Sequence, residues 1–256
     1  MKKLSILLLS MLAMTMFTAC GDDDEPENKQ TYTSTINNRA ISGEDVVFSQ
    51  GTAKVELNFS DMTILFSCDY KDINGQSHTF TTPEMALKLK AHSSTVYQFS
   101  QSMGETGSFD GYIDLSNGMM WYTFMDGTTK MVCTTHLLYT TTETQITNPE
   151  NGNTYTHSQS AYLFALGSSG ETCVMRIGNF VTNTNGAVDA TEIEYDGLHV
   201  TPTATGYVIT ADEAVSSLSG YYKITAVNIT VNNQCNAFSG TFTCSGKEIQ
   251  VSGTLF

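Results

Sequence analysis

Pairs of asparagine or aspartate followed by glycine recur along this chain, and they constrain its fold more than any other feature. Seven such pairs lie between Asn74-Gly75 and Asp196-Gly197. They readily adopt the positive φ angles of the tight turns that close β-hairpins. Turns at such short intervals leave little room for long helices, so the sequence predicts an all-β protein built from antiparallel hairpins.

The segments between the turns alternate as strands buried on one face do. Apolar residues alternate with polar ones in two clear runs, at Ala53, Val55, Leu57 and Phe59 and again at Ile249, Val251 and Leu255. In YKITAVNITV the phase slips between Ala226 and Val227, which predicts a β-bulge. The one helix candidate is TPEMALKLKA, residues 82–91, where an alternating pattern leaves a strand equally open.

A repeated pattern runs through the chain at a steady spacing. Residues 33–38 align with 143–148, and 60–70 align with 170–180, both at an offset of 110. Residues 109–124 then align with 238–253, at an offset of 129. Chance matches between similar β segments are the alternative. The spacing favours an internal duplication and predicts two tandem antiparallel β-sandwich or barrel-like domains, residues 32–130 and 131–256.

The first residues have the organisation of a bacterial secretion signal. Lys2 and Lys3 precede an almost wholly apolar run, residues 4–17, that is too short to span a bilayer. Phe17 and Thr18-Ala19-Cys20 resemble the lipobox of bacterial lipoproteins, in which the cysteine becomes the new N-terminus and carries lipid. We therefore expect a signal peptide over residues 1–19 and lipidation of Cys20. The alternative is an ordinary secretory signal in which Cys20 is incidental.

An acidic run, residues 22–25, follows the cysteine and is too strongly charged to join a core. It predicts a flexible tether over residues 20–31. The run also resembles the surface-export signal of Bacteroidetes lipoproteins, which implies a lipid-anchored protein on the outside of the outer membrane. Removing residues 1–19 takes away Lys2 and Lys3, so 10 basic residues face 26 acidic ones and the net charge becomes −16. This excess argues against nucleic acid as a partner.

Besides Cys20 the chain has five cysteines, at positions 68, 133, 173, 235 and 244. The number is odd, and no pair has the spacing of zinc ligands. Between Cys235 and Cys244 the sequence predicts a turn followed by a strand, which would hold the two sulfur atoms beyond disulfide reach. We expect mostly buried thiols.

The C-terminal part of the chain resembles a known group of proteins. MRIGNF, YDGLHVTPTATGYVITAD and FSGTFTCSGKEIQVSGTLF resemble the calycin-like (lipocalin-like) β domains of Bacteroidetes cell-surface lipoproteins. They share a strand ending in Asn-Phe, ladders separated by glycine turns and a closing strand that contains glycine. The resemblance covers roughly the last third of the chain and implies a calycin-like fold there. It carries over no catalytic or ligand-binding residue.

One set of carboxylates has a spacing that occurs in catalytic sites and metal sites. Glu192, Glu194 and Asp196 alternate with apolar residues, so on a strand they would share a face with neighbours about 6.6–7 Å apart. That separation suits an inverting glycosidase pair or a weak calcium site. The simpler interpretation, which we favour, is the solvent face of a strand in an acidic protein. The sequence contains no HExxH, G-x-S-x-G, Walker or G-x-G-x-x-G motif, and we expect no cofactor.

The segment MMWYTFM, residues 119–125, lies between two Asx-Gly pairs and predicts a single strand. At the offset of 129 the core positions are Met120, Tyr122 and Phe124. The opposite face then carries Met119, Trp121, Thr123 and Met125. An apolar second face on an end strand requires a cover.

Two covers are considered for this second face. If the other domain packs against this face, the face is an interdomain junction, which is the favoured interpretation. The alternative is a ligand-binding face on which Trp121 stacks against a sugar or lipid while Met119 and Met125 adapt around it. Polar contacts at its edge would then come from the preceding strand, at Asp110, Tyr112 and Asp114.

Three classes of function follow from the sequence. The favoured one is a non-catalytic binding module for a glycan, a lipid or another small ligand, held at the bacterial outer membrane by its lipid anchor. The second is a structural, adhesin-like subunit that resembles the lipoprotein precursors of Bacteroidales fimbriae, for which Arg39 would be a cleavage point. A hydrolase is disfavoured because no catalytic group of residues is visible, so we expect no enzyme.

Overall fold

The computed structural model describes residues 29–104, 107–116, 118–135, 137–158, 160–218 and 221–254. Within these ranges all regular structure is β-strand, which confirms the all-β prediction. No helix in the described ranges has the length and apolar character needed to cross a bilayer. The chain divides into two compact units between residues 135 and 136.

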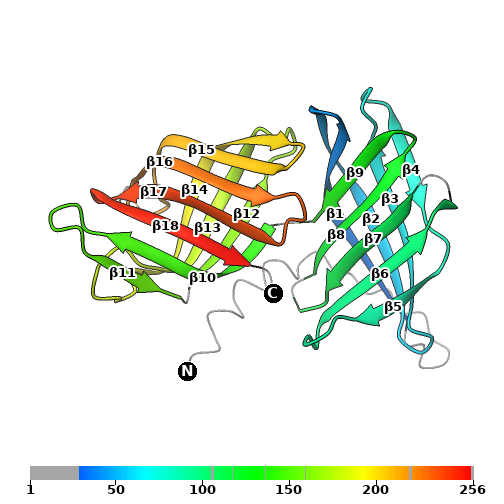
Figure 1. Ribbon diagram of the computed structural model, residues 1–256, viewed down its shortest axis with the longest axis horizontal. Coiled ribbons are helices and arrows are strands. Elements are labelled where there is room, and N and C mark those ends of the chain that lie inside the picture. The colour runs from blue at the N-terminus through cyan, green and yellow to red at the C-terminus, as the bar shows by residue number, and fades with distance from the viewer. Residues whose placement is uncertain are drawn as a thin grey trace. The chain divides into compact units, whose positions relative to one another are not determined.

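Nine strands form the first unit. They are β1 (Lys29–Ser42), β2 (Asp45–Asn58), β3 (Thr63–Lys71), β4 (Ser77–Thr81), β5 (Met85–Leu89), β6 (Val96–Ser102), β7 (Ser108–Asp114), β8 (Met119–Asp126) and β9 (Thr129–Thr134). Their order is β2-β1-β9-β8-β7-β6-β5-β3-β4, and an additional pairing joins β2 to β3. That pairing closes the antiparallel sheet into a ring of eight positions (Figure 1). Strands β4 and β5 share one of these positions, since both pair with the edge of β3 that faces away from β2.

The second unit closes in the same way. Its strands are β10 (Leu137–Thr147), β11 (Thr154–His157), β12 (Ala161–Leu166), β13 (Thr172–Phe180), β14 (Ala190–Thr203), β15 (Gly206–Ala214), β16 (Ile224–Asn232), β17 (Ala237–Cys244) and β18 (Lys247–Thr254). Strands β10 and β12 to β18 follow one another around the ring, and β18 pairs with β10 to close it (Figure 1). Strand β11 pairs with the same edge of β10 as β12 does, so β11 and β12 share one position in the ring. Both units are therefore up-and-down barrels.

Aromatic side chains fill the first barrel. Phe66, Phe109 and Tyr122 are fully buried, and the ring centroids of Phe66 and Tyr122 are 4.3 Å apart. The partly buried ring of Phe80 stacks on Phe124 at 4.2 Å. Because side chains alternate along a strand, each of these inward residues is followed by one that points away from the core.

The second barrel is equally filled. Its largest fully buried side chains are Tyr162, Phe164, Phe180, Tyr195, Tyr207 and Phe242. Phe238 lies among them, with its ring centroid 5.1 Å from that of Tyr162 and 5.5 Å from that of Phe164. The hydroxyl of Tyr195 donates to the carbonyl oxygen of Tyr222 at 2.6 Å, which satisfies one polar group of this interior.

The shared ring order bears on the proposed duplication. The offset of 110 places β1 on β10 and β3 on β13, which occupy the same positions in their two rings. The offset of 129 places β7 and β8 on β17 and β18, which are one position further around the ring. That part of the sequence alignment is therefore wrong in strand order. The unit boundary also falls later than residue 130, because β9 pairs with β1 and β8 in the first barrel.

The structure tests three local predictions, on a strand, a β-bulge and a helix. Residues 119–125 do form one strand, β8, but it lies between β7 and β9 and is not an end strand. The register of β16 against β17 shifts between Thr225 and Asn228, and Ala226 has a φ of 52°, which confirms the bulge. The helix candidate is the strand β5, since Met85 and Leu87 point into the core and leave the lysines outside.

None of the five cysteines in the described residues forms a disulfide, and all five are buried, which confirms the expected thiols. Burial raises the pKa of Cys68 and of Cys173 to about 12. We therefore expect these cysteines to resist Ellman's reagent at pH 8 in the folded protein, because a pKa three units higher lowers the thiolate fraction about a thousandfold. Cys20→Ser protein should release its five equivalents only in denaturant. Rapid labelling of the native protein would contradict the buried placement.

Candidate functional site

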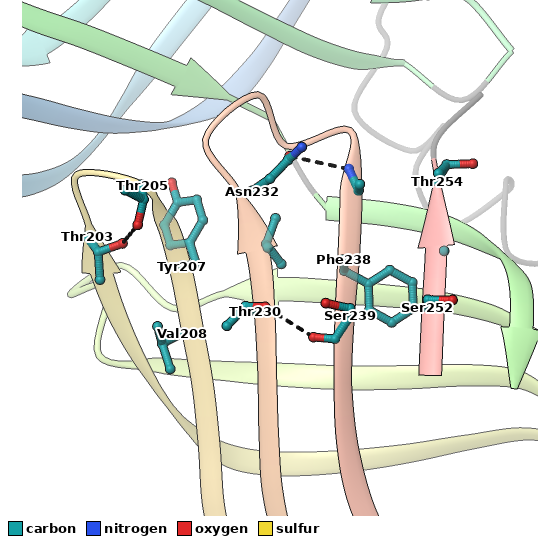
Figure 2. A pocket seen from close by; sticks show the side chains of 13 residues that line it. Thr203, Thr205, Tyr207, Val208, Thr230, Asn232, Phe238, Ser239, Ser252 and Thr254 are labelled. Atoms are coloured by element: carbon teal, nitrogen blue, oxygen red, sulfur yellow. Dashed lines mark hydrogen bonds between the residues drawn. The ribbon is translucent and has the colours of Figure 1, made fainter. Parts of the chain in front are cut away.

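A hollow of about 520 Å³ lies at the end of the second barrel where β14, β16 and β18 finish and β15 and β17 begin. Its thirteen lining residues come from these five strands and from the turn between β14 and β15 (Figure 2). Small-molecule sites have volumes of roughly 300–1,000 Å³. The hollow therefore has the size of a ligand site, and we treat it as the candidate functional site.

A cross-strand row of short side chains forms one side of the hollow. Val208 on β15 pairs with Thr230 on β16, which pairs with Ser239 on β17, and Ser239 pairs in turn with Ser252 on β18. Neighbouring strands lie about 4.8 Å apart, so the row presents hydroxyl groups at that interval. Thr230 and Ser239 are exposed and Ser252 is half-buried, so solvent reaches all three. We call Thr230, Ser239 and Ser252 the hydroxyl row.

The barrel core lies on the opposite face of these strands from the hydroxyl row. Tyr207, Val231 and Phe238 alternate with the residues of the row and are almost completely buried. Phe238 is packed against Tyr162 and Phe164, so the barrel interior is closed beneath the hollow. Gly253 stands opposite Phe238 and adds no side chain at this point. A ligand held here would therefore rest at the end of the barrel and would not enter it.

Hydrogen bonds within two turns give the rim its shape. The hydroxyl of Thr203 donates to the carbonyl oxygen of Gly206 at 3.1 Å and lies 3.3 Å from the hydroxyl of Thr205 (Figure 2). The Asn232 amide oxygen accepts from the backbone N–H groups of Asn236 at 3.0 Å and Ala237 at 3.3 Å. Asn232 thus holds the turn between β16 and β17. The accessible polar side chains of the lining are then the hydroxyl row together with Thr205 and Thr254.

The lining contains no lysine, arginine, histidine, aspartate or glutamate. Its polar groups are hydroxyls, an amide and backbone groups, each of which can serve a neutral hydrogen-bonding partner. The remainder of the lining is apolar, including Val208, Ala237 and Phe238. In a chain with a formal net charge of −14, an uncharged hollow is a distinct local environment.

The structure brings the residues predicted around Trp121 together on one face. Met120, Tyr122 and Phe124 belong to the core, as expected, and Trp121 points to the other side of β8. Tyr112 pairs with Trp121 across β7 and β8, and their rings stack with centroids 5.7 Å apart. The pairs Asp114–Met119 and Asp110–Thr123 lie on either side of this aromatic pair. Met125 follows on the same face of β8 and is half-buried.

Burial and existing contacts limit what this face can offer a ligand. Met119 is fully buried, and Tyr112 and Asp114 are nearly so, while Trp121 is half-buried. The Asp114 carboxylate accepts from the backbone N–H and hydroxyl of Ser116, at 2.9 and 2.7 Å. Asp110 accepts hydrogen bonds from Ser100 and Ser108. The two carboxylates are thus engaged by neighbouring serines.

The carboxylates of β14 do not converge on a site. Glu192 and Asp196 are exposed, and Glu194 forms an ion pair with Arg176 on the neighbouring strand β13. Gly197 has a φ of 70°, and the register of β13 against β14 shifts beside it, between Cys173 and Met175. In the described ranges no group of three or more metal-ligating side chains comes together. Cys20 and the acidic run after it lie outside the described residues.

The comparisons with known proteins do not assign this chain to a family. No family model matches the chain, and no curated protein does. Among solved structures it is similar to isotype 1 transferrin binding protein B from Neisseria meningitidis serogroup B, with a TM-score of 0.29 and 10% sequence identity. That similarity covers 90% of this chain and 75% of the other. At this TM-score it carries no functional argument, so the function is argued from the residues.

Sequence reasoning missed the hollow. Its lining residues lie between Thr203 and Thr254 and contain no motif, because threonine and serine on a solvent-facing strand position are ordinary. Only the pairing of three neighbouring strands places the three hydroxyls in one row. The bulge in β16, which the sequence does reveal, shifts the register of that strand against β17 and so decides which residues stand opposite each other.

Proposed function

We propose that this chain is a lipid-anchored lipoprotein of the bacterial cell surface whose second barrel binds a small uncharged ligand without changing it chemically. The observation that carries the proposal is the uncharged, hydroxyl-lined hollow of about 520 Å³ at the end of that barrel. A pocket with a few polar groups over an apolar floor is the usual form of a small-molecule site. The up-and-down closure of both sheets, which lipocalin barrels share, supports the calycin-like resemblance.

A non-catalytic role is favoured by the chemistry of the lining. General acid–base or nucleophilic catalysis requires a titratable group or an activated nucleophile close to the reacting atoms. The hollow offers hydroxyls with no histidine, lysine or carboxylate beside them in its lining. Binding is therefore the activity that these residues support.

The anchor is proposed from the lipobox-like residues around Cys20. We expect Cys20→Ser to move the protein from the membrane fraction to the soluble fraction, because lipidation with two or more acyl chains is needed for stable anchoring. Intact-protein mass spectrometry should find a mature chain that starts at a lipidated Cys20. A mature chain that begins at Ala40 would instead support the fimbrial alternative.

The position of Arg39 favours the anchored module over that alternative. Arg39 is fully buried within β1, where it pairs with Phe48 on β2 and with Val132 on β9. A protease reaches an extended, exposed segment, so cleavage after Arg39 would require β1 to leave both neighbouring strands. The fimbrial role would therefore need a partly unfolded precursor.

A blocking substitution tests the binding site whatever the ligand. We expect Ser239→Trp to abolish binding of any probe held in the hollow, because the indole would fill the space above the row. Thr241→Trp is the matched control, since it lies on the same strand and face but outside the lining. Calorimetric titration would use maltotriose, xylotriose, mannotriose, sialyllactose and monoolein. Absence of binding by every probe, or equal binding by both variants, would overturn the proposed site.

The face around Trp121 stays a second, weaker proposal as a ligand face. Its half-buried indole could stack on a ring, and Met125 could adapt beside it. The complete burial of Met119 and the engaged carboxylates leave it less accessible polar surface than the hollow has. We therefore propose the hollow at the end of the second barrel as the ligand site.

A further inference from the structure

The hydroxyl row matches one class of ligand better than others. Each serine or threonine hydroxyl can donate one hydrogen bond and accept others, so the row has no preference for donors or acceptors alone. Thr230 donates to the carbonyl oxygen of Ser239 at 3.3 Å and so retains acceptor capacity. Ser239 is exposed and Ser252 is half-buried, so a ligand can reach the hydroxyls of both. A ligand carrying several hydroxyls of its own is complementary to such groups.

Charged ligands are disfavoured by the same lining. Carboxylates and phosphates are usually held by arginine or lysine, and cations by carboxylates. The hollow has none of these side chains. An anion would also meet the repulsion of a chain whose formal net charge is −14. A neutral ligand avoids both costs.

An acyl chain is disfavoured because the hollow has no enclosed apolar volume to hold it. A lipid tail gains binding energy from an enclosed apolar volume. Here the interior beneath the hollow is occupied by Phe238, Tyr162 and Phe164. On the face that carries the row, the apolar side chains of the lining are Val208 and Ala237. That small area suits the C–H face of a sugar ring.

Short side chains also make the row ready for binding. Serine and threonine lose little side-chain entropy when a ligand orders them, whereas lysine or glutamine would lose more. The strands beneath are fixed by continuous ladders, including the pairs Thr230–Ser239 and Ser239–Ser252. The hydroxyl positions are therefore set before the ligand arrives.

We propose, on the basis of the function proposed above, that the ligand of the second barrel is a neutral carbohydrate that lies across the ends of β15 to β18. Its hydroxyls exchange hydrogen bonds with Thr230, Ser239 and Ser252. Its apolar ring face rests near Val208 and Ala237. Because the interior is closed beneath it, the site takes a short segment or the end of a glycan.

The test uses the chain without residues 1–19, with Cys20→Ser to keep it in solution, and the three neutral trisaccharides as probes. Amide chemical shifts should move at Thr230, Ser239 and Ser252 on titration with at least one of them. Thr230→Val and Ser252→Ala should each weaken that binding about three- to tenfold, the effect of losing one hydrogen bond. The control Thr241→Val should leave the affinity unchanged, since Thr241 lies outside the hollow.

The outcomes separate this inference from the proposed function. Binding of monoolein but of no neutral trisaccharide, if blocked by Ser239→Trp, would overturn the neutral carbohydrate and leave the proposed function standing. Binding of sialyllactose alone, if blocked by Ser239→Trp, would overturn the neutral ligand in both proposals and leave only the hollow as a binding site. Trisaccharide binding that is unaffected by Thr230→Val and Ser252→Ala would overturn the hydroxyl row as the recognition surface. If none of the probes binds at millimolar concentration, both proposals fail. Unchanged circular dichroism of each variant would confirm that folding is not the cause.

Discussion

Phe109→Ala is expected to lower the free energy of unfolding of the first barrel by about 3–5 kcal/mol, the usual cost of removing a buried phenylalanine ring. Phe109 is fully buried, and five other rings surround it, with centroids at 5.4 Å (Phe66), 5.5 Å (Phe80), 5.6 Å (Phe99 and Tyr122) and 6.2 Å (Phe124). The strands around it are joined in a closed ring and cannot move inward independently. The cavity left by the ring should therefore collapse only partially.

Urea unfolding followed by tryptophan fluorescence measures this effect directly. The only tryptophan of the chain, Trp121, lies in the first barrel and reports on that unit alone. Phe59→Ala is the matched control, because Phe59 is partly buried at the edge of the same core and contacts Tyr97 edge-on at 6.1 Å. We expect less than half the loss for the control. Equal midpoints for the two variants would show that Phe109 is not central to the core.

The second large effect is expected at Gly206, where β15 begins beside the hollow. Its φ is +145°, and a Cβ atom added there would lie 1.8 Å from the carbonyl oxygen of Val231. Gly206→Ala should therefore destabilise the second barrel by about 3 kcal/mol or more, because backbone strain and overlap with a neighbouring strand act together. Thr203, which bonds to the Gly206 carbonyl, should be displaced with it.

Gly197→Ala provides the comparison within the same barrel. Gly197 has a φ of +70°, but a Cβ atom there would meet nothing within 4 Å, so only the strain of about 1–2 kcal/mol remains. Hydrogen–deuterium exchange of the peptides that cover β14 to β16 should rise strongly for Gly206→Ala and slightly for Gly197→Ala. Similar exchange in the two variants would mean that the contact with Val231 is easily relieved.

The sequence predicted the strands well because alternation and turns are local properties. Strand β8 and the bulge at Ala226 were both visible in it, as was the inward placement of Met120, Tyr122 and Phe124. The closure of the sheets into rings was not visible in the sequence. The strand pairs that close them, such as Ile146–Ile249, join residues distant in the chain. Strand β9 was assigned partly to the wrong domain for the same reason.

The candidate site could not be predicted from the sequence, for a physical reason. Trp121, the carboxylates of β14 and Arg39 drew interest because their residue types are rare or charged. The structure shows Glu194 paired with Arg176 and Arg39 within a doubly paired strand. Thr230, Ser239 and Ser252 are common residues at solvent-facing positions, and their importance arises only from their register across three strands.

Ring closure has a consequence for many copies of this protein crowded at one surface. An open sheet offers two edges to which a neighbouring molecule can add strands, and that risk rises with local concentration. In the described residues this closure pairs β2 with β3 in the first barrel and β10 with β18 in the second. Copies of the protein at high local concentration should therefore add strands to one another less readily than open sheets would.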